Sequence, residues 1–108
     1  MAGNGQILSR IAYGADSSSL PPFSKSTADV VIVPESTITA AHTYVLDTTD
    51  AQAGSTITFK KDTTGFDITV RQTGGALIGV LSTTPTAGYR WFDLIFTTKW
   101  ELLRFQVA

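Results

Sequence analysis

The side chains that could carry acid–base or metal chemistry are few and widely spaced in this sequence. His42 is the single histidine and cysteine is absent, so a histidine-based or thiolate metal site would lack ligands. No Ser-His-Asp signature can be recognised around His42, which follows Ala40 and Ala41 between two strand-like segments. This setting favours a histidine that is structural or simply exposed, and a hydrolase is therefore disfavoured.

The carboxylates do not form a recognisable catalytic or metal-binding motif either. Glu35 and Glu101 are the two glutamates, and sequence spacing cannot pair either one with an aspartate as in a glycosidase. A calcium loop needs densely spaced oxygen ligands around a glycine bend, and Asp47 and Asp50 offer too few. The glycine pair at 74–75 indicates a turn rather than a phosphate-binding loop, because no helical pattern follows it. We predict no catalytic residue, no metal ligand and no cofactor.

Composition points to one small domain made of strands. The chain has 108 residues, of which 43% are apolar and 16% charged, with a net charge of −1. Threonine is in excess, and β-branched hydroxyl residues suit the solvent side of a pleated sheet. The basic side chains are scattered singly, so we expect no nucleic-acid partner. The N-terminus lacks the layout of a secretory signal and no apolar run could span a bilayer, so we expect synthesis in a cytoplasm and no membrane partner.

Strand patterns separated by turn residues recur about every ten positions after residue 28. Residues 54–60 alternate with Ile57 and Phe59 inward, and residues 66–71 alternate with Phe66, Ile68 and Val70 inward. Turns are expected at 62–65 and 73–75. The pattern predicts an all-β fold, an antiparallel β-sandwich or small barrel of about seven or eight short strands. The predicted strands are 30–33, 37–40, 43–47, 54–60, 66–71, 76–82 and the two arms of a terminal hairpin.

Residues 1–28 differ from the rest because they are rich in glycine, serine and proline. Such a segment is typical of an extended arm, so we divide the chain into an N-terminal arm, 1–28, and a β-sandwich domain, 29–108. One apolar island interrupts the arm, and its spacing permits about one and a half helical turns ending near Gly14. The island either packs on its own domain or docks on another subunit, with Ile7, Leu8, Ile11 and Tyr13 as the anchor.

The end of the chain, residues 89–107, has the pattern of two strands joined by a polar break at 97–99. Large apolar side chains occupy both faces of the first strand, at 89, 91 and 95 on one face and at 92, 94 and 96 on the other. One face can fill the core of a small domain, and the second needs another cover. We therefore predict an oligomer interface formed by Trp91, Phe92, Leu94 and Phe96.

Two further interpretations of the hairpin remain open. Its aromatic side chains could form a platform for stacking sugar rings, namely Tyr89, Trp91 and Trp100. Arginines at positions 90 and 104 could also face Asp93 or Glu101 across the two arms, as modest surface pairs.

From about residue 37 to 107 the chain resembles a recurring β-domain of tailed-bacteriophage virion proteins. The resemblance rests on the strands Thr-Tyr-Val-Leu-Asp-Thr, Ala-Gly-Ser-Thr-Ile-Thr-Phe and Phe-Asp-Ile-Thr-Val, and on the hairpin ending Lys-Trp-Glu-Leu-Leu. In fibre, spike and head-decoration proteins, similar strands end in a hairpin whose second arm opens with tryptophan. The Asp-Gly turn usual before that tryptophan is replaced here by Thr97 and Thr98.

The small size and the Gly/Ser/Pro arm are closer to capsid decoration, or cement, proteins than to long fibres with coiled-coil or repeat stalks. The resemblance implies a non-enzymatic structural protein on the capsid surface of a virion, made in the host cytoplasm. It also implies a homotrimer whose extended terminus grips the major capsid protein. The alternative is a receptor- or glycan-binding tip domain of a phage tail fibre or spike.

Overall fold

A computed structural model describes residues 9–34, 38–61, 66–84 and 87–108 of the chain. Within these ranges all helical or extended structure is β-strand, which confirms the prediction of an all-β fold with seven or eight short strands. The strands are β1 (Ile11–Tyr13), β2 (Val30–Val33), β3 (His42–Leu46), β4 (Thr56–Lys61), β5 (Ile68–Gln72), β6 (Leu77–Leu81), β7 (Tyr89–Phe96) and β8 (Trp100–Val107).

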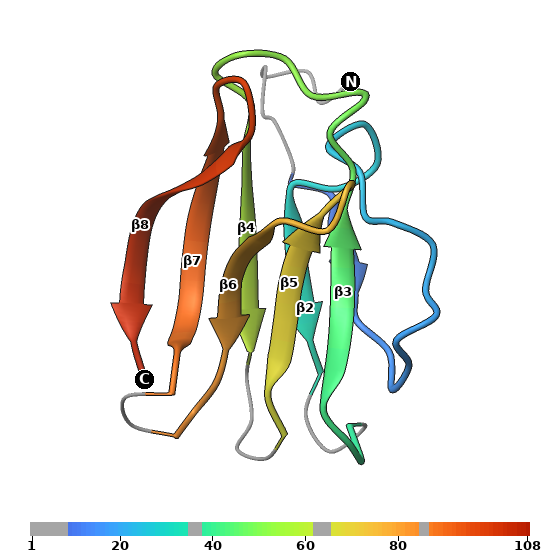
Figure 1. Ribbon diagram of the computed structural model, residues 1–108, viewed down its shortest axis with the longest axis vertical. Coiled ribbons are helices and arrows are strands. Elements are labelled where there is room, and N and C mark those ends of the chain that lie inside the picture. The colour runs from blue at the N-terminus through green and yellow to red at the C-terminus, as the bar shows by residue number, and fades with distance from the viewer. Residues whose placement is uncertain (1–8, 35–37, 62–65, 85–86) are drawn as a thin grey trace, which may run out of the picture.

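The strands form one sheet that curls back on itself into half a barrel (Figure 1). Its hydrogen-bonded order is β1-β2-β4-β7-β6-β5-β3, and β8 pairs with β7 outside this path. As a result β3, β5 and β6 make one wall and β1, β2 and β4 make the other. The hairpin of β7 and β8 lies at the side where the two walls meet.

The pairing is mixed rather than purely antiparallel. β2 runs parallel to β4 and β3 parallel to β5, whereas β4–β7, β5–β6 and β7–β8 are antiparallel. From β2 to β5 successive strands alternate between the two walls, so neighbours within one wall are separated by a strand of the other. The chain reverses direction each time it passes from one wall to the other. After two such passages it runs in its original direction, so the neighbouring strands of one wall are parallel. Side chains alternate in the same way in both kinds of pair, so periodicity in the sequence does not distinguish them.

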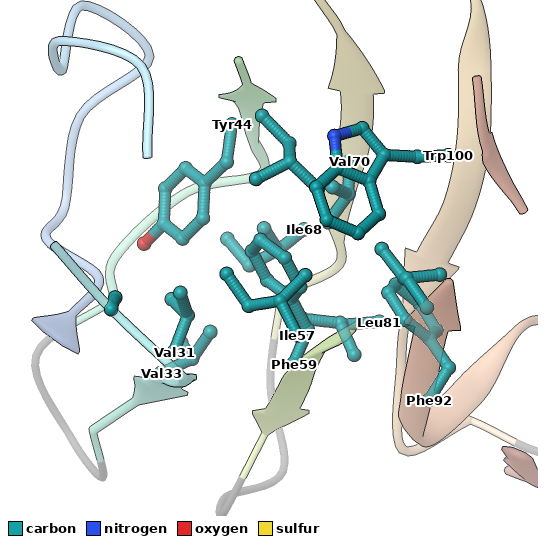
Figure 2. Close-up of a cluster of buried hydrophobic side chains, with 13 residues drawn as sticks. Val31, Val33, Tyr44, Ile57, Phe59, Ile68, Val70, Leu81, Phe92 and Trp100 are labelled. Atoms are coloured by element: carbon teal, nitrogen blue, oxygen red, sulfur yellow. The ribbon is translucent and has the colours of Figure 1, made fainter. Parts of the chain in front are cut away.

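The hydrophobic core fills the space between the two walls (Figure 2). β4 alternates as predicted, with Ile57 and Phe59 buried and Thr56 and Lys60 exposed. Full burial of an aliphatic or aromatic side chain is worth about 1.5–3 kcal/mol, so this cluster is the main source of the fold's stability. Its larger members are Val31, Val33, Tyr44, Leu46, Ile57, Phe59, Ile68, Val70, Leu81, Phe92, Leu94 and Trp100.

Trp100 closes this core at the start of β8. Its indole N–H donates to the carbonyl oxygen of Asp47 at 3.0 Å, and its backbone N–H donates to Oε1 of Gln72 at 3.0 Å. Its ring stands edge-on to the ring of Phe96, with centroids 5.3 Å apart. These contacts fasten the start of β8 to the C-terminal ends of β3 and β5, which lie side by side.

Some local predictions differ from the structure. Residues 38–40 form no strand, and Phe66 is 50% exposed just before β5 instead of facing inward. β5 begins at Ile68, so the buried alternation comprises Ile68 and Val70. The turn expected at 73–75 is present, with φ of 98° at both Gly74 and Gly75. The turn expected at 62–65 and position 37 lie outside the described residues.

Residues 9–29 run along two edges of the curled sheet, beside β2 and beside β3. At one edge β1 pairs with β2, and the Gly14 N–H donates to the Ile32 carbonyl at 2.8 Å. At the other edge Phe23 lies beside β3, where its N–H donates to the Val45 carbonyl and its carbonyl accepts from the Asp47 N–H, both at 2.8 Å. The described part of the predicted arm therefore packs along the domain.

The described part of this apolar island, Ile11–Tyr13, is a strand, and the helical turn expected to end near Gly14 is wrong. In β1, Ala12 packs against the core while Ile11 and Tyr13 point away from it. Pairing with β2 satisfies the backbone groups that a helix would have satisfied within itself. The island's spacing is compatible with a short strand whose outer face is apolar.

Candidate functional site

β8 is an edge strand with an unusually exposed set of side chains. Among the strands of the described residues it pairs with β7 alone. Every residue from Leu103 to the end of the strand is exposed, and the apolar ones are Leu103 at 45%, Phe105 at 51% and Val107 at 63%. An open edge that carries exposed apolar side chains is a ready template for another chain. We refer to Leu103, Phe105 and Val107 as the β8 patch.

The register with β7 decides which β8 side chains point toward the core. Directly opposite residues of an antiparallel pair lie on the same face. Phe105 is opposite Phe92 and Leu102 is opposite Leu94, and both partners are fully buried. Phe105 and Leu102 therefore lie on the core side of the hairpin. Phe105 is nevertheless half exposed, because the core thins out toward this end of β8.

The charged residues of β8 lie on the outer face because the strand contains a bulge. Glu101 is opposite Ile95 and Arg104 is opposite Asp93, while Leu103 is the extra residue between the two regular registers. In a regular strand, residues 101 and 104 would point to opposite faces. The extra residue restores them to one face.

The core is incompletely covered at the end of β8. The Tyr89 and Phe105 rings pack with centroids 4.9 Å apart, and a groove of about 380 Å³ lies beside them. The groove is lined by Ala87, Gly88, Tyr89, Val107 and Ala108. Position 88 requires glycine, because a Cβ there would lie 2.4 Å from the carbonyl oxygen of Val80. This groove extends the β8 patch around the end of the sheet.

Polar contacts fix the outer face of the same hairpin. Nε of Arg104 lies 3.1 Å from Oδ2 of Asp93, which confirms that an arginine at 104 faces this carboxylate. The Thr58 hydroxyl donates to Oδ1 of Asp93 at 2.6 Å, and the Trp91 indole N–H donates to Oε1 of Gln106 at 3.0 Å. The Arg104 side chain is 72% exposed, so the ion pair adds little stability. It joins the outer faces of β7 and β8.

The predicted interface residues have different positions from those expected. Phe92 and Leu94 are 0% exposed and belong to the core of the single chain, so neither offers surface to a second subunit, and this part of the prediction is corrected. Trp91 is half-buried on the outer face, and half-buried Phe96 packs on Trp100. The surplus apolar surface thus comes from the second strand of the hairpin rather than from the first.

A signal for the β8 patch is visible in the sequence. Leu102 and Leu103 are adjacent, and Phe105 and Val107 follow at every second position. This run breaks a single alternation, which is typical of a bulged strand with apolar groups on both faces. The prediction instead placed the interface on the first strand, where the aromatic residues are most concentrated.

Two of the predicted anchor residues, Ile11 and Tyr13, lie on β1, away from β8 in the same sheet. Ile11 and Tyr13 on β1 are 51% and 62% exposed, so both side chains are accessible. Ile7 and Leu8 lie outside the described residues. The aromatic platform is not assembled as predicted, because Trp100 is buried, Tyr89 packs against Phe92 on the core side, and Trp91 faces outward.

The structure also assembles a polar cluster that the sequence did not reveal. Nε2 of His42, at the start of β3, lies 2.6 Å from Oδ1 of Asp16, and its Nδ1 lies 3.0 Å from the Ser18 hydroxyl. The Thr39 N–H donates to Oδ1 of Asp16 at 3.0 Å, and the Thr43 N–H donates to the Ser18 hydroxyl at 3.2 Å. Asp16 and Ser18 come from the N-terminal segment, so the cluster joins this segment to β3.

This cluster has the order of contacts of a Ser-His-Asp triad but serves as a fastening. Since an ionised carboxylate only accepts hydrogen bonds, Nε2 of His42 donates to Asp16 and Nδ1 can accept from Ser18. Hydrogen bonds from the Thr39 hydroxyl, the Thr39 N–H and His42 lower the pKa of Asp16 to about 2. The Ser18 oxygen also accepts from the Thr43 backbone N–H. The arrangement joins the N-terminal segment to β3.

A second cluster fastens the beginning of β1. The backbone N–H of Arg10 donates to Oδ2 of Asp29 at 2.8 Å, and the side-chain Nε of the same arginine lies 3.2 Å from that oxygen. Lys25 also contacts Asp29. Hydrogen bonds from Arg10 and then Lys25 hold the pKa of Asp29 well below its usual range. The carboxylate therefore stays ionised and keeps the two cations together.

In the described part of the chain, no three His, Asp or Glu side chains come together as a metal would require. No helix suited to crossing a bilayer occurs within the described ranges. No protein-family model matches the chain, and no curated protein or solved structure matches it either.

Proposed function

We propose that this protein is a non-enzymatic assembly module that associates through the edge of β8. The observation that carries the proposal is the β8 patch: three half-exposed apolar side chains on an edge strand paired on one side only. Soluble proteins usually blunt such edges, and an apolar edge that is not blunted is typical of a contact surface. The fastening clusters at Asp16 and Asp29 give the module a rigid body on which to carry that surface.

The setting we propose is a bacteriophage virion, in which the protein decorates the capsid and stabilises it by joining neighbouring shell subunits. Support for this setting is the resemblance of residues 37–107 to phage β-domains, together with the small all-β fold. Exposed apolar residues at both edges of one sheet, β1 and β8, suit a small protein that must contact more than one neighbour. Ile11 and Tyr13 would contact the major capsid protein, and the β8 patch would contact another copy.

A matched pair of variants tests the proposal. Phe105 and Phe66 are the same residue type and are 51% and 50% exposed, but only Phe105 lies in the β8 patch. Sedimentation velocity of the full chain should show an oligomer, and Phe105→Asp should shift it toward monomer while Phe66→Asp leaves it unchanged. Binding to bare bacteriophage capsids should fall with Phe105→Asp in the same way. A chain that is monomeric at all concentrations and does not bind capsids would overturn the proposal.

A glycan- or receptor-binding tip is the alternative function, and one observation favours it. Trp91 lies half-buried on the outer face, opposite Gln106 and with Lys60 on the neighbouring strand. An aromatic ring flanked by polar side chains on the outer face of a sheet can stack on a sugar ring. Titration of the wild type and of Trp91→Ala with oligosaccharides distinguishes the two functions. A glycan-binding tip would bind an oligosaccharide and lose that binding in Trp91→Ala, whereas assembly through β8 does not require Trp91.

A further inference from the structure

We infer that the partner of β8 is β8 of a second copy, paired antiparallel about a twofold axis between Leu102 and Leu103. This inference rests on the proposed assembly function and specifies its partner and register. In this register Glu101 of each copy is opposite Arg104 of the other. Trp100 is opposite Phe105, so its backbone N–H would exchange the bond to Gln72 for one to the partner strand. The β4–β7–β8 sheet of one copy would continue directly into that of its partner.

The bulge at Leu103 is what permits this register. When two copies of a regular strand pair antiparallel about a twofold axis, opposite residues must point to the same face of the sheet. Residues 101 and 104 of a regular strand would point to different faces, so they could not be opposite each other. In this chain the extra residue places Glu101 and Arg104 together on the outer face, as their partners Ile95 and Asp93 show. The same shift places Trp100 and Phe105 together on the core side, opposite Phe96 and Phe92. The faces therefore match on both sides of the axis.

Charge complementarity selects this pairing among possible occupants of the edge. Glu101 and Arg104 are the charged residues of β8 and have opposite signs, so the twofold pairing brings each against its complement, twice. Both side chains are exposed, and the Arg104 guanidinium also contacts Asp93 on β7. The pairing also covers Phe105 and Leu103, which are half exposed in one copy.

Charge reversal with mixing tests the register. Glu101→Arg places two arginines opposite each other, and Arg104→Glu places two glutamates opposite each other. Each variant alone should dimerise about tenfold more weakly than the wild type, since directly opposite like charges destabilise a strand pair. An equimolar mixture of the two variants should recover the wild-type affinity, because each reversed residue then meets its complement. Arg71→Glu, on β5, is the control and should change nothing.

The outcomes separate this inference from the proposed function. Recovery in the mixture supports the twofold pairing, because effects within one chain cannot be repaired by a second chain. If either variant fails to fold by circular dichroism, Glu101→Gln and Arg104→Gln replace it, and both should weaken the dimer. A trimer, or an oligomer sensitive to Phe105→Asp but indifferent to these charges, would overturn the twofold pairing and leave assembly through β8 standing. Wild-type protein that stays monomeric would overturn the pairing, and its capsid binding would then decide the proposed function separately.

Discussion

The hydroxyl group of Tyr44 donates a hydrogen bond to the carbonyl oxygen of Ala15 across 2.7 Å, and so ties β3 to the N-terminal segment. Tyr44 is 1% exposed, and its burial, with a smaller effect of the Asp16 charge, raises its pKa to about 12. The donor therefore stays protonated over the physiological range. Gly14 allows this approach, because a Cβ at that position would lie 2.4 Å from the Tyr44 hydroxyl.

Removing this hydroxyl should destabilise the fold. We expect Tyr44→Phe to lower the free energy of unfolding by about 1 kcal/mol, the usual net value of one such hydrogen bond. Urea denaturation followed by circular dichroism measures the change. Tyr13→Phe is the matched control, because Tyr13 is 62% exposed, and it should leave the midpoint unchanged. Equal losses in the two variants would contradict the role assigned to the Ala15 contact.

The N-terminal segment should contribute to the stability of the domain. Deleting residues 1–20 removes β1, the Ala15 acceptor and the Asp16 cluster. We expect the deletion to cost about 2 kcal/mol and to lower the midpoint of thermal unfolding by about 10 °C, given the usual scaling for a domain of this size. Differential scanning calorimetry is the measurement. An unchanged midpoint would instead favour an arm that is independent of the domain.

Acid should weaken the hydrogen bonds that Asp16 accepts from Thr39 and His42. Its pKa is lowered from 3.8 to about 2, with the Thr39 hydroxyl as the largest cause. A group with a depressed pKa stabilises the fold above its ordinary pKa, and this contribution is lost as the pH falls through the folded value. We expect the stability difference between wild type and Asp16→Asn to be largest above about pH 4 and to shrink toward pH 2.

Urea midpoints of the two proteins, measured from about pH 6 down to about pH 2, test this dependence. The comparison with Asp16→Asn is needed because hydrogen bonds also lower the pKa values of Asp29, Asp47 and Asp50, so the whole protein weakens in acid. A difference that stays constant with pH would show that the Asp16 carboxylate does not act through its charge.

Truncation of the two tryptophans should have unequal effects. Trp100 is 3% exposed and bonds to the Asp47 carbonyl, whereas Trp91 is half-buried on the outer face. We expect Trp100→Ala to lower the free energy of unfolding by about 3–5 kcal/mol, as for other buried aromatics, and Trp91→Ala to lower it much less. Guanidinium denaturation measures both. The reverse order would mean that Trp100 does not close the core.

The strands themselves could be predicted from local pattern. Alternation in residues 54–60 and 66–71 indicates strands whatever their partners are, because side chains of any strand point alternately to its two faces. The hairpin at 89–107 follows from two apolar runs around a polar break, since adjacent antiparallel strands need only a short connection. These features depend on neighbours in sequence, and the sequence contains all the information they require.

The candidate site depended instead on which strands became neighbours. The pairing of β4 with β7 decides which strand of the hairpin is buried. β4 lies along the side of β7 that faces away from β8, although the two strands are far apart in the sequence. That contact buries Phe92 and Leu94 and leaves β8 at the edge. The meeting of Asp16 with His42 likewise requires the N-terminal segment to cross between the walls, and no spacing in the chain announces it.

The sequence by itself therefore determined an all-β domain, its approximate strands and its terminal hairpin, because these follow from side-chain alternation and turn chemistry within short stretches. Only the tertiary structure decided the mixed pairing, the strand that replaces the expected helical turn at Ile11, and the exposure of Phe105 and Val107. The physical reason is that a strand's register and its position in the sheet are set by long-range backbone pairing, which has no local signature. A single bulge residue, Leu103, then changes which side chains share a face.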